Sequence, residues 1–214
     1  CLSVHGNPIH PNGKIAAAHD ADFQRCVRLA AKLGVEVVAT FSGCPGGAPG
    51  DQQPNWVTCP WPPEYLDILD YQWRDVVIPY WQKTTAFVRQ QGIHKIALEM
   101  HPGFVVYNPE TLLKLRDAAG PEIGANFDPS HLIWQGIDPC AAVRALQGAI
   151  WHVHAKDTCV QQWNSRTNGV LDTKHYGDEL HRSWLFRTVG YGSSRQSWCD
   201  FVSALRMTGY DHAL

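Results

Sequence analysis

The segment Ala97-Leu98-Glu99-Met100-His101-Pro102-Gly103 decides the fold, because a short apolar run ends there on a carboxylate. Two later segments, residues 126–131 (Asn-Phe-Asp-Pro-Ser-His) and 152–157 (His-Val-His-Ala-Lys-Asp), repeat this arrangement. The run before each polar residue favours a β-strand. The three strands end on Glu99, Asp128 and His154, which are residue types that bind divalent metal ions.

These three residues are separated by 29 and 26 positions. A strand, a helix and their two loops occupy roughly 30 residues, so the spacing predicts three successive strands of a parallel sheet. Glu99, Asp128 and His154 would then lie at the carboxyl ends of their strands, where barrel enzymes carry their active sites. We therefore expect an α/β fold with helices outside a parallel sheet.

Strand and helix patterns alternate along most of the chain, which supports the same architecture. Two segments break the alternation: residues 42–63 are rich in Gly and Pro, and residues 158–194 show no clear periodicity. We expect one domain over residues 1–214, with these two segments as long loops on its rim. The expected strands are 1–4, 35–41, 94–99, 122–128 and 149–154, with another starting at 212; the expected helices are 22–33, 66–91 with a break at Pro79, 109–119, 139–146 and 198–207.

Composition excludes some classes of partner. The chain of 214 residues has a formal net charge of -2 and no basic cluster, which argues against a nucleic acid partner. No apolar run reaches the ~18 residues of a membrane span, and no signal peptide opens the sequence, so we expect no membrane partner. The sequence leaves open whether the protein forms a homo-oligomer.

Cysteine and aromatic content narrow the class further. The seven cysteines are an odd set without a Cys-x-x-Cys pair. They favour reduced thiols in a cytoplasmic protein over a disulfide framework or a structural zinc site. Nine Trp, seven Tyr and seven Phe are compatible with stacking on carbohydrate rings, although any single one is more often a core residue.

Each polar residue at a strand end also has a structural interpretation. Asp128 precedes Pro129 and suits a helix cap, while a lone His154 is more often a core residue. Their recurrence at one spacing instead favours a single metal site that includes Glu99. Oxygen and nitrogen donors without Cys favour Mn²⁺, Mg²⁺ or Co²⁺ over Zn²⁺, and we expect one Mn²⁺ ion.

Five further residues are candidates for binding the substrate. His131 lies three positions after Asp128 and can reach the cavity of the expected metal site. His5 and His101 follow other expected strands. Lys156 and Asp157 either hold a bound sugar or pair with each other.

The motifs Leu-Glu-Met-His-Pro at 98–102, Asp-Pro-Ser-His at 128–131 and His-x-His-x-Lys-Asp at 152–157 resemble those of a known family. It is the sugar isomerase and epimerase family of xylose-isomerase-like barrels, which includes ketose 3-epimerases and inosose dehydratases. The resemblance covers nearly the whole chain and implies a (β/α)₈ TIM barrel. It further implies one divalent metal held by Glu99, Asp128, His154 and a second Glu, with His131 in contact with the substrate.

The sequence departs from the family pattern in two ways. The family's second Glu would lie beyond Leu214, and the predicted strands correspond to the second to sixth of the barrel and the start of the seventh. We therefore expect an incomplete barrel that lacks the first and last βα units. The epimerases also carry an Arg shortly after the His ligand, where this chain has none; Arg166 is too distant to correspond.

The resemblance implies a sugar isomerase or epimerase acting on a small sugar or polyol. Glu99 would remove a proton next to a carbonyl, through a metal-bound enediolate. The first alternative is a lyase or dehydratase acting on a keto-sugar, an inosose or a keto-glycoside, because residues 158–194 enlarge an aromatic rim. Two less favoured alternatives are a non-catalytic sugar-binding subunit and an abasic-site endonuclease, for which the net charge is unsuitable.

Overall fold

The computed structural model describes residues 1–214. The chain divides into two compact units, Cys1–Phe127 and Asp128–Leu214, and each is described by itself. None of the helices combines the length and the apolar character that a crossing of a lipid bilayer requires.

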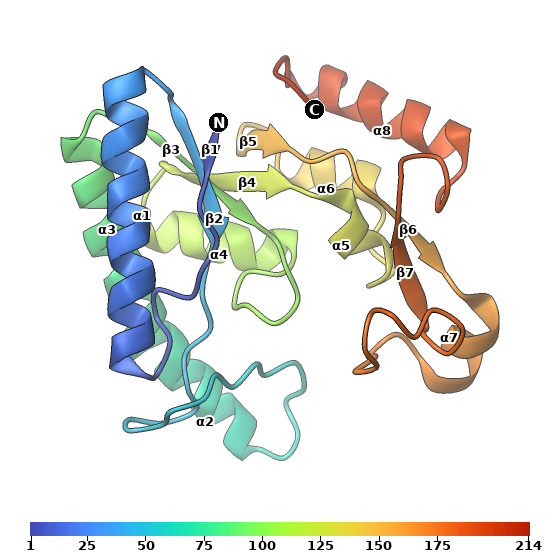
Figure 1. Ribbon diagram of the computed structural model, residues 1–214, viewed down its shortest axis with the longest axis horizontal. Coiled ribbons are helices and arrows are strands. Elements are labelled where there is room, and N and C mark those ends of the chain that lie inside the picture. Colours follow the sequence, from blue (N-terminus) through green and yellow to red (C-terminus); the bar gives the residue numbers. More distant parts are fainter. The chain divides into compact units, whose positions relative to one another are not determined.

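The first unit is built on a parallel sheet. Its strands follow the order β1 (Leu2–Ser3), β2 (Val37–Phe41), β3 (Lys95–Glu99) and β4 (Ile123–Phe127), as Figure 1 shows. The pairing aligns Phe41 with Glu99 and Glu99 with Asn126, so the carboxyl ends of these strands meet at one edge of the sheet. The predicted parallel arrangement is confirmed in this unit.

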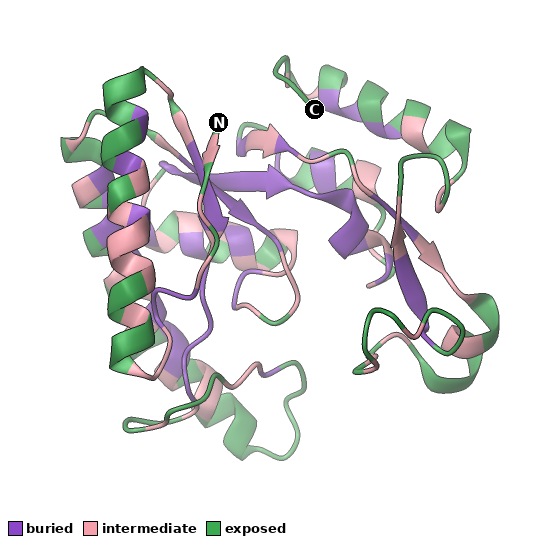
Figure 2. Ribbon diagram, in the orientation of Figure 1, coloured by how far each residue is buried: buried purple, intermediate pink, exposed green.

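Helices cover the sheet of the first unit. Helix α1 packs against β1 and β2, and α4 packs against β4. All five residues of β4 and four of the five in β3 are buried, and Figure 2 shows β4 in the purple of buried residues. The helices are α1 (Gly13–Leu33), α2 (Glu64–Tyr71), α3 (Ile78–Gln90) and α4 (Pro109–Ala119), and a π-helical segment, η1 (Gln72–Val77), joins α2 to α3.

Two helices differ from their predictions. Helix α1 begins at Gly13 rather than near position 22, because the Asn12 side chain accepts hydrogen bonds from Lys14 N (3.1 Å) and Ile15 N (3.4 Å) and so caps an earlier first turn. The irregularity expected at Pro79 falls just before it, in η1. In a regular α-helix the backbone N–H of residue 79 would donate to the backbone carbonyl of Asp75. Proline has no N–H, which accounts for the wider, π-helical turns just before it.

Residues 42–63 contain no helix or strand but are held at defined points. Asn7 contacts both backbone groups of Cys44: its Nδ2 donates to the Cys44 carbonyl (2.8 Å), and its Oδ1 accepts from the Cys44 N–H (3.0 Å). Gln72 Nε2 donates to the carbonyl of Asn55 (2.6 Å), and Trp81 Nε1 to that of Ser42 (3.0 Å). Burial raises the pKa of the Cys44 thiol to about 12.

The second unit contains a strand between helices and an antiparallel hairpin. Strands β6 and β7 pair from Asp157 opposite Arg187 to Val160 opposite Trp184. The prediction of an irregular segment over 158–194 is therefore wrong in part, because β6, α7 and β7 lie within it. The strand expected from 212 is absent. The elements are α5 (Pro129–Ile133), α6 (Pro139–Ala145), β5 (Ile150–Val153), β6 (Asp157–Val160), α7 (Gln162–Asn168), β7 (Trp184–Arg187) and α8 (Arg195–Met207).

Candidate active site

Glu99 is the last residue of β3 and is only 6% exposed. Asn126, its neighbour on β4, donates from Nδ2 to Glu99 Oε2 (3.1 Å). His5 Nε2 lies 3.5 Å from the same oxygen. A buried carboxylate is stable only with such partners, and these contacts fix the orientation of the Glu99 side chain at the edge of the sheet.

His5 and His101 both lie beside Phe41, the last residue of β2. The ring of His5 is 4.4 Å from that of Phe41 between centroids, and the ring of His101 is 5.2 Å away. Phe104 stacks on Phe41 at 4.4 Å. The first unit thus brings both predicted histidines to the end of the sheet that carries Glu99.

Asp128 follows β4 directly and caps helix α5. Its Oδ1 accepts a hydrogen bond from Ser130 N (2.9 Å), which confirms the capping interpretation. Its Oδ2 lies 3.4 Å from His131 Nε2 and 3.3 Å from Lys156 Nζ. Of the two alternatives left open for Lys156, the pairing with Asp157 is not the contact found, because the ammonium group lies against Asp128.

An aromatic residue that the sequence analysis missed lies between His131 and Lys156. The ring of Phe186, on β7, is perpendicular to the ring of His131 at 5.2 Å, and Lys156 Nζ lies 3.9 Å from its centroid. His131 is 2% exposed. Phe186 thus supports both side chains by packing and by a cation–π contact.

His154 follows β5, and its ring packs against that of His152 at 5.3 Å. The two histidines alternate with Val153, which is fully buried, so they share the opposite face. Burial, followed by the charge of His154, lowers the pKa of His152. The assignment of His154 as a metal ligand stays a prediction.

Asp157 has a structural role in the second unit, and its contact with substrate stays a prediction. Its carboxylate is fully buried and accepts hydrogen bonds from the backbone N–H groups of Thr158, Gly190, Gly192 and Ser193 at 2.8 to 3.0 Å. Trp198 Nε1, on α8, donates to it as well (3.0 Å). Burial raises the pKa of Asp157, but the hydrogen bonds, led by that of Ser193, outweigh this effect and lower it overall.

Each unit by itself carries donor groups of the types that bind a hard divalent cation. Glu99 in the first unit and Asp128 in the second are buried carboxylates, and His131 and His154 supply imidazole nitrogen. Asp128 Oδ2 faces Lys156 and His131 at distances longer than the 2.7–2.9 Å typical of charge-assisted hydrogen bonds. This buried oxygen therefore lacks a close partner among those two groups, and a carboxylate oxygen of this kind is suited to a hard cation; the role of Asp128 as a ligand stays a prediction.

Of the residues that sequence reasoning missed, only one had a local signal. Asn126 precedes Asp128 by two positions within the expected strand 122–128, so strand alternation predicts that the two side chains share a face. Phe186 lies 55 positions after His131 in a segment without periodicity. No spacing in the sequence indicates that contact.

Comparison with known proteins agrees with this description. The sequence profile of the family described as xylose isomerase-like TIM barrel matches residues 1–214. The uncharacterized protein YfiH of Bacillus subtilis (strain 168) is 46% identical over 212 residues, which cover 98% of this chain and 67% of YfiH.

Two solved structures share the fold. A xylose isomerase-like TIM barrel protein of Mycobacterium smegmatis, in complex with magnesium, gives a TM-score of 0.62 at 17% identity, over 98% of this chain and 63% of its own. A D-tagatose 3-epimerase-like protein gives a TM-score of 0.55 at 23% identity, over 98% of this chain and 67% of its own. The chain therefore spans about two thirds of these relatives, and it belongs to the family of xylose isomerase-like TIM barrels.

Proposed function

We propose that this protein is a divalent-metal-dependent sugar isomerase or epimerase that removes a proton next to a carbonyl group. The substrate is a small sugar or polyol. Family membership supports sugar chemistry, since one similar structure is that of a D-tagatose 3-epimerase-like protein. The observation that carries the proposal is the buried Glu99 carboxylate, oriented by Asn126 at the carboxyl end of β3.

Glu99, Asp128 and His154 are the proposed ligands of one divalent ion. Such an ion supplies positive charge that polarises a carbonyl oxygen and makes the neighbouring C–H group more acidic. Mn²⁺ is the ion we expect, and the structure similar to this chain that contains magnesium supports a hard cation in this family.

Glu99 is the proposed base. A carboxylate that is fixed within reach of a C–H group next to a carbonyl can accept the proton as a general base. Asn126 and His5 both contact Oε2, so the carboxylate reaches the substrate in one orientation. This fixed orientation contributes to the rate by holding the base near the C–H bond.

His131 and Lys156 are the proposed contacts to substrate oxygens. The Lys156 ammonium carries three donors and is partly exposed, with 38% of its side chain accessible. His131 is held by Phe186 and by its contact with Asp128. The two residues can therefore donate hydrogen bonds to hydroxyl or carbonyl groups and exclude other orientations of the sugar.

Glu99→Gln tests the catalytic assignment in the full-length natural protein supplied with Mn²⁺. We expect turnover to fall by about 10²–10⁴-fold, because the amide cannot accept the proton. Turnover is measured by screening ketoses, inososes and keto-glycosides. Glu122→Gln is the matched control, since Glu122 is also 6% exposed but pairs with Arg89 (2.7 Å). Glu122→Gln should lower the stability of the protein and leave kcat unchanged. Full activity of Glu99→Gln would show that Glu99 is not the base.

The second candidate is a lyase acting on a keto-sugar or keto-glycoside. It uses the same proton removal, but the electron pair then expels a hydroxyl or alkoxyl group from the neighbouring carbon. The β6–β7 hairpin favours it, because this segment brings the aromatic ring of Phe186 beside Lys156. Product analysis in deuterated water separates the two: an epimerase returns a sugar of equal mass apart from one deuterium, whereas a lyase releases water or an alcohol.

A further inference from the structure

The first unit contains a cavity that the proposed reaction does not use. Its volume is about 370 Å³, which falls within the roughly 300–1,000 Å³ of pockets that hold small ligands. Its walls come from residues 56–60 of the loop 42–63, from the end of α2 and the start of η1, and from residues between 105 and 114. Glu99 does not line this cavity, and neither do the histidines beside it. The cavity is therefore a separate candidate for binding a ligand.

Two sets of hydrogen bonds fix the walls of the cavity. Gln72, the first residue of η1, is 1% exposed and donates from Nε2 to the carbonyls of Gly46 (3.0 Å) and Asn55 (2.6 Å), which holds the loop in place. The first turn of α4 has a capping box, in which Thr111 N donates to Asn108 Oδ1 (2.9 Å). Walls that are fixed in advance lower the entropy cost of binding a ligand.

Part of the wall is aromatic or aliphatic. Trp73 belongs to η1 and is 6% exposed, and π-helical turns such as these are frequent at functional sites. Trp56 meets Tyr107 edge to face, with ring centroids 5.6 Å apart. Val57 and Val105 also line the cavity and are buried. These side chains give an apolar surface on which the C–H groups of a ligand can pack.

The cavity also carries a lysine and two carboxylates that do not pair with it directly. Lys114 Nζ lies 4.1 Å from the centroid of the Trp73 ring and forms no hydrogen bond or ion pair. Asp70 pairs with Arg74 instead, and Glu110, one turn before Lys114 on α4, has no hydrogen-bond partner. Partial burial lowers the pKa of Lys114, and the charges of Asp70 and Glu110 act in the opposite direction. Both acids are therefore close to the ammonium group without touching it.

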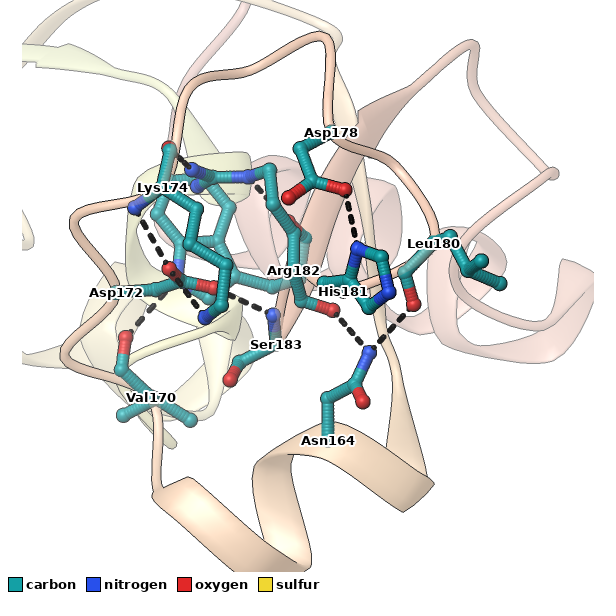
Figure 3. Close-up of polar contacts among 10 residues, drawn as sticks. Asn164, Val170, Asp172, Lys174, Asp178, Leu180, His181, Arg182 and Ser183 are labelled. Carbon is teal, nitrogen blue, oxygen red and sulfur yellow. Dashed lines mark hydrogen bonds and ion pairs between the residues drawn. The ribbon is translucent and has the colours of Figure 1, made fainter.

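Lys174 in the second unit shows a direct pairing for comparison. Its side-chain and backbone nitrogens both donate to Asp172 Oδ1 (3.0 and 2.9 Å), and Asp172 Oδ2 accepts from Ser183 N (2.6 Å), as Figure 3 shows. Lys114 lacks such an acceptor although two carboxylates are near. A hydroxyl group donates to a carboxylate and accepts from an ammonium group, so it can bridge the two.

We propose that this cavity is a second ligand site of the protein and binds a neutral saccharide ring. The C–H groups of the ring pack on the aromatic wall, and its hydroxyl groups join Lys114 to Glu110 and Asp70. Charges of both signs line the cavity, so a ligand with a net charge meets a like charge there and a neutral ligand does not. The site holds a sugar without converting it, because the proposed base lies outside the cavity.

Cys59 lines the cavity and is exposed, so the reactivity of its thiol reports whether the cavity is occupied. The test labels the full-length natural protein with N-ethylmaleimide in the presence of Mn²⁺ and quantifies the labelled peptides by mass spectrometry. The ligand is methyl glucoside, which has no carbonyl group for the proposed reaction. At about ten times its dissociation constant it should slow the labelling of Cys59 by about tenfold, since only the empty cavity reacts. Labelling of Cys1 and Cys199, which are exposed but do not line the cavity, should not change.

Lys114→Met tests the polar contact. Methionine can keep the packing on Trp73 but has no N–H group, so the dissociation constant should rise by about tenfold. Lys32→Met is the matched control, because Lys32 is exposed in the last turn of α1 and does not line the cavity. An equal dissociation constant for Lys114→Met and the wild type would overturn the inference, as would the absence of any protection of Cys59 by methyl glucoside.

Three further ligands test the chemical class: the methyl glycosides of glucuronic acid and of glucosamine, and benzyl alcohol. The first is an anion, the second a cation and the third an apolar ring with a single hydroxyl group. Methyl glucoside should protect Cys59 at the lowest concentration, and better protection by any of the other three overturns the assignment to a neutral saccharide. Turnover of keto-sugars without protection of Cys59 would retain the proposed reaction and overturn the second site. Protection without turnover would retain the second site and overturn the proposed reaction.

Discussion

At the scale of single residues, Asp128 caps a helix and leaves its second oxygen for the proposed metal, two roles that the sequence presents as alternatives. One oxygen caps α5 through Ser130 N–H, and the other faces His131 and Lys156. A carboxylate has two oxygens with separate lone pairs, so capping does not exclude ligation. Substitutions that keep one function and remove the other can therefore distinguish them.

Asp128→Asn should keep the fold and lose the metal. Asparagine caps helices about as well as aspartate does, but its neutral side chain is a poor ligand for a hard cation. Asp128→Ala should lose both functions, with a cost of about 1 kcal/mol in the free energy of unfolding for the missing cap.

Metal analysis and isothermal titration with Mn²⁺ give one measurement, and urea unfolding without added metal gives the other. We expect about one ion per chain in the wild type. Tight Mn²⁺ binding by Asp128→Asn would exclude this carboxylate as a ligand. A loss of stability in Asp128→Asn as large as that in Asp128→Ala would contradict the separation of roles.

At the scale of secondary-structure elements, the β6–β7 hairpin depends on one buried carboxylate. Asp157, the first residue of β6, binds the N–H groups that follow β7 and the indole of Trp198 on α8. The sequence could not predict this arrangement, since its partners lie 33 to 41 positions away and share no period. By contrast β3 and β4 were predictable, because their apolar runs and their spacing are local features.

Asp157→Asn should lower the free energy of unfolding by about 1–3 kcal/mol at pH 7, since an amide nitrogen then faces buried donors. The pKa of Asp157 is lower in the folded protein than the ~3.9 of an unfolded aspartate. Its contribution is therefore complete above about pH 4 and lost as the pH falls through the folded pKa.

Urea unfolding of the wild type and Asp157→Asn at several pH values from 7 to 3 measures this dependence. The difference between the two proteins should narrow below about pH 4. Asp211→Asn, at an exposed position of the same unit, should match the wild type throughout. A difference that stays constant down to pH 3 would show that the charge of Asp157 does not contribute.

At the scale of the whole molecule, the sequence predicted the fold class and the family, and both are confirmed. The strand ends that carry Glu99 and Asp128 followed from the chain alone. The support around them did not: Phe186 reaches His131 only through the non-local pairing of β6 with β7. That residues 1–214 belong to one barrel domain, with His154 as a ligand, stays a prediction.

Because Asn7 holds Cys44 in place, the rate at which the Cys44 thiol is labelled reports how often the loop of residues 42–63 opens. A thiol with a pKa of about 12 is almost entirely protonated at pH 8, so Cys44 reacts with disulfide reagents only when residues 42–63 separate from Asn7. Cys1, Cys59 and Cys199 are exposed and should react first. Asn7→Ala should speed the slow labelling of Cys44 without changing the fast phase, as mass spectrometry of labelled peptides would record. The labelling rate of Cys44 thus measures how often this loop opens in the native protein.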